Sequence, residues 1–268
     1  MKKIYFILLL SLLVCVGCQF KWTDDNKSDD RLIKIERFDR LEYRYLTVGD
    51  YSALQQMSTE FPFETRTLIE KVLKIGQITD PDINSKFLKF YQDTTLQTII
   101  SSVQSKYSNI NDIQKELSIA FARLEQQIPN LQIPKVYTQI SALDQSIVAG
   151  DGKIGISLDK YLGEDYPIYN KYYIKQQRKQ MTRDNIIPDC LMFYLMSLYP
   201  LRNYDFRPQF ERDIHMAKIQ WVANKAMSNN YYKGKYVDIV SKFMKINPNI
   251  KFEELLESTD FSGFANLN

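Results

Sequence analysis

One segment in the middle of this chain changes its hydrophobic period, and it limits the folds that the whole sequence can adopt. Residues 134–143 (PKVYTQISAL) and 153–158 (KIGISL) are β-like, with Ile154, Ile156 and Leu158 on one face of an extended strand. Between them, residues 149–152 (AGDG) are typical of a turn. The simplest prediction is an antiparallel hairpin, in which Gly155 permits close approach of a neighbouring backbone or side chain.

The residues on both sides of this segment have helical periodicity. A short extended segment is expected at Leu32–Asp39, and Asp50 is expected to cap a helix over Tyr51–Ser58. A segment from Asp184 to Tyr199 is apolar around almost its whole circumference, which predicts a central buried helix. The sequence therefore predicts an α+β fold, predominantly α-helical with a small antiparallel sheet. Two amphipathic helices are expected before the β-like segment, one with Leu96, Ile99, Ile100, Val103 and Tyr107 and one with Ile113, Leu117, Ala120, Phe121 and Leu124.

The N-terminus has the order of features of a bacterial lipoprotein signal over residues 1–17. Lys2 and Lys3 precede an apolar run of 13 residues, Ile4–Val16, whereas a membrane-spanning helix needs about 20. The run leads into Gly17 and Cys18, which resembles a lipobox in which cleavage leaves Cys18 as a lipidated N-terminus, although Cys15 stands where leucine is commonest. An ordinary signal peptide and an uncleaved anchor are the alternatives.

The mature chain divides into an acidic tether, residues 18–31, and a single globular domain, residues 32–268. The tether contains Asp24, Asp25, Asp29 and Asp30, which fit either a solvated linker or a surface-export signal like that of some Bacteroidetes lipoproteins. A net charge of +3 is close to balance, so no nucleic-acid partner is predicted. Cys190 lies in an apolar run and is expected to be a small buried residue.

The sequence offers little for catalysis. His215 is the only histidine, which excludes His-Glu-x-x-His zinc peptidases, and we predict no catalytic residue, no metal and no cofactor. Asp184 and Asp189 are five residues apart and so do not share a helix face as a catalytic pair would. Acidic residues gather around the predicted hairpin and its exit, but their spacing matches no calcium loop. Tyrosines there predict either core packing or a ledge for a sugar or peptide, with the candidate binding residues Asp159, Tyr161, Tyr166 and Tyr169.

Four further stretches of the chain carry a family resemblance: Ile35–Asp39 (IERFD), Pro134–Ser141 (PKVYTQIS), Ile154–Gly163 (IGISLDKYLG) and Asp165–Tyr169 (DYPIY). Together with the lipobox they resemble the gliding-motility lipoprotein GldB family of Bacteroidetes, and Gly155–Tyr169 is the most specific region. The resemblance implies a cell-envelope lipoprotein associated with the motility apparatus or with envelope assembly and maintenance. It transfers a defined role to Cys18 alone.

The order of elements also resembles a distant zinc-peptidase arrangement without its metal motif. The helix from Asp184 stands where a metal-binding helix would be, but Asp189 and Phe193 occupy the i, i+4 positions and cannot replace two histidines.

Two functional hypotheses follow. The first is a non-enzymatic protein that acts through envelope protein partners and is lipid-anchored through Cys18 to the inner or outer membrane, at the periplasmic face or the cell surface. The alternative is a peptide- or glycan-binding protein, or a hydrolase, that uses the tyrosine-rich region after the β-like segment.

Overall fold

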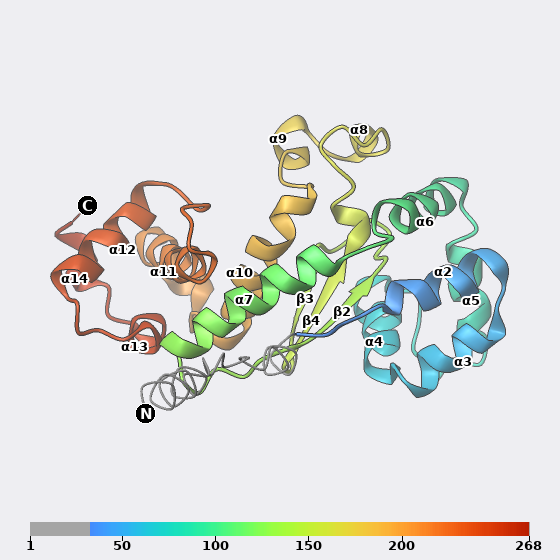
Figure 1. Cartoon of the computed structure of the whole chain (residues 1–268), viewed down its shortest axis with the longest axis horizontal. Helices are drawn as coiled ribbons and strands as arrows, with labels where there is room; N and C mark the ends of the chain where they lie inside the picture. Colours follow the sequence, from blue (N-terminus) through green and yellow to red (C-terminus); the bar gives the residue numbers. More distant parts are fainter. Residues whose placement is uncertain (1–32, 268) are drawn as a thin grey trace, which may run out of the picture. The chain divides into compact units, whose positions relative to one another are not determined.

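Four short strands form a mixed sheet in this computed structural model, which describes residues 33–267 (Figure 1). The spatial order is β1-β2-β4-β3. Strand β2 is parallel to both β1 and β4, and β3 is antiparallel to β4. The strands are β1 (Ile35–Glu36), β2 (Lys135–Gln139), β3 (Ile147–Gly150) and β4 (Lys153–Ser157).

The predicted pairing of the two β-like segments is wrong. Strands β2 and β4 are parallel, with Val136 opposite Ile154, and the antiparallel partner of β4 is β3. The cause is the tight turn at Asp151 and Gly152, where φ is 51° and 68°. A two-residue loop with two positive φ values closes a hairpin directly between the strands that flank it. Strand β3 therefore takes the place that was assigned to residues 134–143.

The predicted role of Gly155 is confirmed. It lies opposite Tyr137 in the parallel pair, and a Cβ atom at position 155 would lie 2.5 Å from Cζ of Tyr137. The tyrosine ring occupies the space above the glycine backbone, so a side chain at position 155 would collide with the ring of Tyr137.

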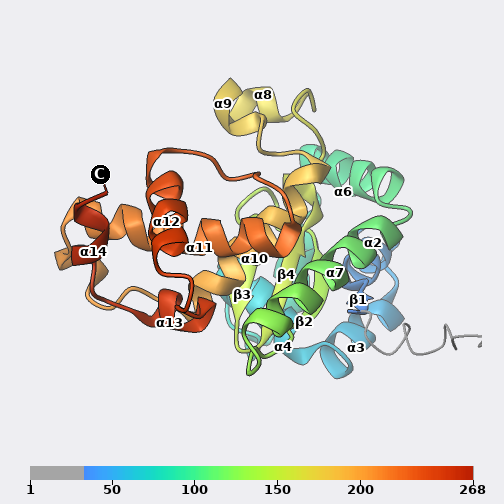
Figure 2. The same ribbon diagram turned by 60° about the vertical axis from the view of Figure 1, so that its left-hand side comes forward.

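Helices make up 60% of the structure and surround the sheet, which confirms the predominantly helical α+β class (Figures 1 and 2). Helix α10 contacts β3, β4, α7 and α11, and α2 contacts β2 and α6. The α-helices between β1 and β2 are α2 (Phe38–Val48), α3 (Tyr51–Thr59), α4 (Pro62–Arg66), α5 (Ile83–Phe90), α6 (Thr94–Lys106) and α7 (Asn111–Gln127). Those after β4 are α8 (Tyr169–Tyr172), α9 (Lys175–Arg178), α10 (Ile186–Leu198), α11 (Gln209–Met227), α12 (Lys235–Ile246), α13 (Phe252–Glu257) and α14 (Ser262–Ala265).

Several local predictions are confirmed. The side chain of Asp50 accepts hydrogen bonds from the backbone N–H groups of Ser52 and Ala53 and so caps α3. Helices α6 and α7 bury the apolar faces that their periodicity predicted. Cys190 is fully buried in α10.

Two boundary predictions need correction. The helix predicted from Asp184 begins later, because Asp184 lies in a 3₁₀ turn over Arg183–Asn185 and α10 begins at Ile186. The extended segment at Leu32–Asp39 is reduced to β1, because Phe38 already begins α2.

The described chain begins against α7. The backbone N–H of Ile33 donates to Ser118 Oγ at 2.9 Å, and that of Ile35 donates to Gln114 Oε1 at 3.1 Å. These two bonds and the two-residue strand β1 hold the start of the domain to its core. The predicted signal peptide, the tether and Cys18 lie outside the described residues.

Candidate functional site

Asp159 lies at the carboxyl end of the two parallel strands, because β4 runs directly into a 3₁₀ turn over Leu158–Lys160. Its carboxylate is fully buried and accepts hydrogen bonds from the backbone N–H groups of Ser141 (2.9 Å) and Leu143 (2.6 Å). Burial raises the pKa of Asp159, and these two hydrogen bonds oppose the rise. The loop it holds contains Ala142 and Leu143 at φ values of 53° and 66°. Asp159 therefore stabilises an unfavourable backbone conformation at the end of β2.

The tyrosines chosen from the sequence are tied into the same network. Tyr169 is fully buried, and its hydroxyl accepts from Leu162 N–H and donates to the Asp159 carbonyl. Tyr166 is partly exposed, and its hydroxyl donates to Ser102 Oγ at 3.0 Å. Three of the four predicted residues, Asp159, Tyr161 and Tyr169, are thus buried together, and their polar groups are bonded within the protein. We refer to these four residues as the strand-end cluster.

A small pocket of about 200 Å³ lies beside this cluster, with Tyr161 in its wall. The Tyr161 hydroxyl donates to Asp189 Oδ2 at 2.8 Å, and the Lys160 ammonium donates to the Tyr173 hydroxyl at 2.9 Å. Burial raises the pKa of Asp189 to about 6 and lowers the pKa of Lys160. The pocket therefore brings a carboxyl and an ammonium group with shifted pKa values to one polar cavity, an arrangement that often marks binding or proton transfer.

Asp189 lines this pocket, whereas the sequence predicts no site role for it, either beside Asp184 or in the i, i+4 pair with Phe193. The structure separates the two, since Asp184 is exposed and Asp189 is half-buried. The available signal was a single charged residue within the otherwise uncharged sequence of α10.

The donor groups for a metal are dispersed. Within residues 33–267, no three His, Cys, Asp or Glu side chains gather in a metal-binding group. His215 is buried on α11, and burial together with the nearby Lys218 lowers its pKa. On α10, Asp189 faces the tyrosine pocket described above.

The family model described as "Gliding motility protein GldB" matches residues 19–236. This chain belongs to the GldB family. The match covers most of the chain and begins at the residue after Cys18. No curated protein and no solved structure matches the chain.

Family membership indicates a gliding-motility lipoprotein, that is, a membrane-anchored protein of the cell envelope. Over residues 33–267, no helix combines the length and apolarity needed to cross a bilayer. Lipidation of Cys18 stays a prediction, because this residue lies outside the described part of the chain.

Proposed function

We propose that this GldB-family protein is anchored to the envelope through a lipid on Cys18 and acts without catalysis, through envelope protein partners. Its role would lie in the gliding apparatus or in envelope assembly and maintenance. The match to the family over residues 19–236 carries this proposal. The leader supports it, because charge, apolar run, small residue and cysteine follow one another in the order of a lipoprotein signal.

The burial and internal hydrogen bonds of the strand-end cluster support the non-enzymatic part of the proposal. A general base or nucleophile must reach a substrate atom, but Asp159 and Tyr169 are fully buried and bonded to the backbone. Their arrangement is that of groups that hold a loop and a turn in place.

The alternative is a peptide- or glycan-binding protein, or a hydrolase, at the pocket beside Tyr161. The observation in its favour is the shifted pKa of Asp189 next to Lys160 in one cavity. The volume of this pocket, about 200 Å³, is below the range of roughly 300–1,000 Å³ that is usual for ligand sites, so we rank this alternative second.

The first test compares the wild type with Cys18→Ala in the native bacterium. Mass spectrometry of the N-terminal peptide should find an acylated Cys18, and only the wild type should remain in the membrane fraction. Photo-crosslinking of the membrane-bound protein should then capture envelope proteins. An unmodified N-terminus, or crosslinking to lipid alone, would contradict the proposal.

A second test separates the two hypotheses. Asp189→Asn keeps an acceptor for the Tyr161 hydroxyl but removes the titrating carboxyl. If the protein acts without catalysis, this variant complements a deletion strain as well as the wild type does. Failure of the variant, at normal abundance in the cell, would favour the alternative.

A further inference from the structure

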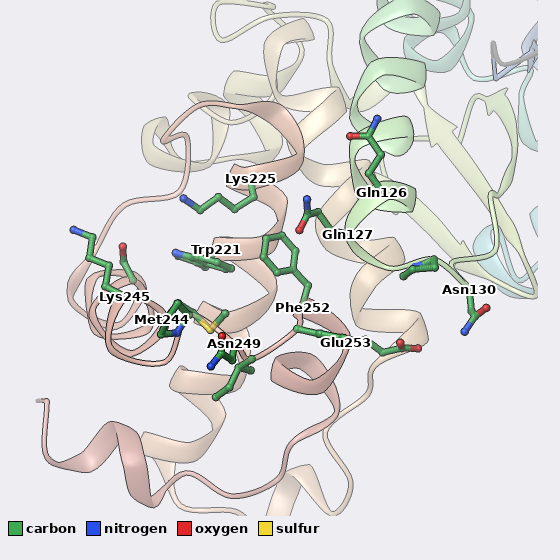
Figure 3. Close-up of a pocket in the computed structure, with 15 residues that line it drawn as sticks. Gln126, Gln127, Asn130, Trp221, Lys225, Met244, Lys245, Asn249, Phe252 and Glu253 are labelled. Carbon is green, nitrogen blue, oxygen red and sulfur yellow. The ribbon is translucent and has the colours of Figure 1, made fainter.

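A second and larger cavity lies among the C-terminal helices, away from the strand-end cluster. It has a volume of about 720 Å³ and is lined by residues from the end of α7 and from α11, α12 and α13, together with the loops that follow α7 and α12 (Figure 3). We call it the C-terminal groove. Its size lies within the usual range for ligand sites of roughly 300–1,000 Å³.

The floor of the groove is aromatic. The rings of Trp221 and Phe252 lie side by side in Figure 3, with centroids 5.1 Å apart and an interplanar angle of 67°. Trp221 is only 7% exposed, whereas Phe252 is half-buried and offers an accessible ring. A rigid aromatic surface of this kind suits the apolar face of a ring-shaped ligand.

The charge around the groove is mostly positive. Lys225, Lys245 and Lys251 line it and are exposed, and Glu253 is the one acidic residue in its lining. Within residues 33–267, none of the three lysines forms an ion pair, although the Lys225 ammonium lies 5.0 Å from the Trp221 ring centroid. These charges can therefore meet an anionic ligand without breaking an ion pair of the described residues.

Four amide side chains complete the polar lining, and each can both donate and accept hydrogen bonds. None of them has a side-chain hydrogen bond to another residue of the 33–267 region. Hydroxyl groups of a sugar are likewise donors and acceptors, so they match amides well. The amides are those of Gln126, Gln127, Asn130 and Asn249.

We propose that the C-terminal groove binds a carboxylate-bearing glycan of the cell-wall type. The ring of Phe252 matches the apolar face of a sugar ring, and the four amides match its hydroxyls. The three lysines match the carboxylates. An extended acidic peptide is disfavoured because the groove is built from helices and loops and has no strand edge to pair with a peptide backbone. The choice of the cell wall as the source of this glycan rests on the envelope location proposed above. Binding of the glycan does not depend on Cys18.

The test measures binding of the purified full chain, in detergent, to soluble cell-wall fragments that carry free carboxylates. A matched ligand has the same carboxylates converted to amides. We expect the acidic fragment to bind and the amidated one to bind several-fold more weakly, with an affinity that falls as salt increases. No binding of the acidic fragment at millimolar concentration, or equal binding of both ligands, would overturn the proposal.

Two variants of the groove locate the site. The double variant Lys245→Gln/Lys251→Gln should weaken binding by roughly 2- to 30-fold, the range for two solvent-exposed charge pairs. Phe252→Leu should weaken it by about tenfold through loss of the ring contact. Lys242→Gln is the matched control, because Lys242 is exposed on α12 but does not line the groove, and its binding should equal that of the wild type.

The remaining outcomes are also decisive. Unfolding curves must first show that the variants are folded. Unchanged binding by both folded groove variants would overturn the assignment of glycan binding to the C-terminal groove. Binding of a short polyglutamate peptide as tight as that of the glycan fragment, with the same dependence on the lysines, would assign the groove to acidic peptides instead. Because these measurements need neither the lipid nor a protein partner, they fail or succeed separately from the proposed function.

Discussion

The strand-end cluster and the C-terminal groove both combine aromatic rings with charged groups, yet they treat their polar atoms in opposite ways. In the cluster, Asp159 and Tyr169 are buried and bonded to the backbone. In the groove, Lys245 and Lys251 are exposed and have no ion pair among the described residues. The difference shows that polar and aromatic residues close together in the sequence can stabilise the fold. A surface suited to binding can instead be formed by residues that are far apart in the sequence.

The largest effect is expected in the cluster, for Asp159→Ala. Loss of the carboxylate leaves the buried N–H group of Ser141 and the part-buried N–H group of Leu143 without acceptors, each at a cost of about 1–3 kcal/mol. The free energy of unfolding in urea should therefore fall by about 2–6 kcal/mol. The control is Asp144→Ala in the same loop, where the side chain is exposed and a change below about 0.5 kcal/mol is expected. A loss of unfolding free energy below about 1 kcal/mol for Asp159→Ala would contradict the structural role of Asp159.

A buried lysine on α11, the helix that also carries Trp221 of the groove, gives the next effect. Lys218 is fully buried on α11, its ammonium donates to the Ser258 carbonyl at 2.9 Å, and burial lowers its pKa to about 8. Between pH 8 and the unfolded-state value of about 10.4, the unfolded chain binds more protons, so stability rises with pH.

Lys218→Met should remove this rise. The difference in unfolding free energy between the wild type and the variant should change by about 2 kcal/mol from pH 8 to pH 9.5. Lys225→Met, on the same helix but exposed, should leave the pH dependence of the wild type unchanged. Parallel curves for the wild type and Lys218→Met would contradict the lowered pKa of Lys218.

An effect of opposite sign is expected at Asp189, whose pKa is raised to about 6. The folded state binds more protons than the unfolded state between pH 4 and pH 6, so the stability contributed by this group is lost as pH rises through 6. Asp189→Asn should therefore be about 2–3 kcal/mol more stable than the wild type at pH 7.5 and equal to it near pH 4. Thermal unfolding at the two pH values checks this, with the exposed Asp184→Asn as a control that should show no gain.

The smallest effect on stability is expected in the C-terminal groove. Lys245→Gln/Lys251→Gln breaks no ion pair among the described residues, so its free energy of unfolding in urea should lie within about 0.5 kcal/mol of the wild type. A loss above 1 kcal/mol would mean that the lysines support the fold, and the contrast between the two regions would disappear.

Local patterns were enough to predict much of the fold. The apolar periodicity of α6 and α7 and the capping residue Asp50 were all read correctly, because each depends on neighbours within a few residues. The pairing of the strands was not, because the turn at Asp151 and Gly152 joins β4 to β3 and not to residues 134–143. Parallel pairing of β2 with β4 depends on contacts across the sheet that periodicity does not encode.

The sites were harder to predict for a related reason. The sequence placed Asp159 and Tyr161 in one region correctly, but their burial depends on the packing of α10 and of residues 141–143 around them. The C-terminal groove joins residues from 126 to 253, and no local spacing connects them.

The attachment of Ile33 has a mechanical consequence. Cys18 precedes Ile33 by 15 residues, so a pull on the chain at that cysteine enters the domain at Ile33. The first bonds to bear the load are those to Ser118 and Gln114, followed by the two-residue strand β1. Once these give way, β2 loses its neighbour and exposes an unpaired edge at Val136 and Tyr137. Tension applied through Cys18 would therefore load the attachment of β1 to β2 and α7 before it reaches the rest of the described chain.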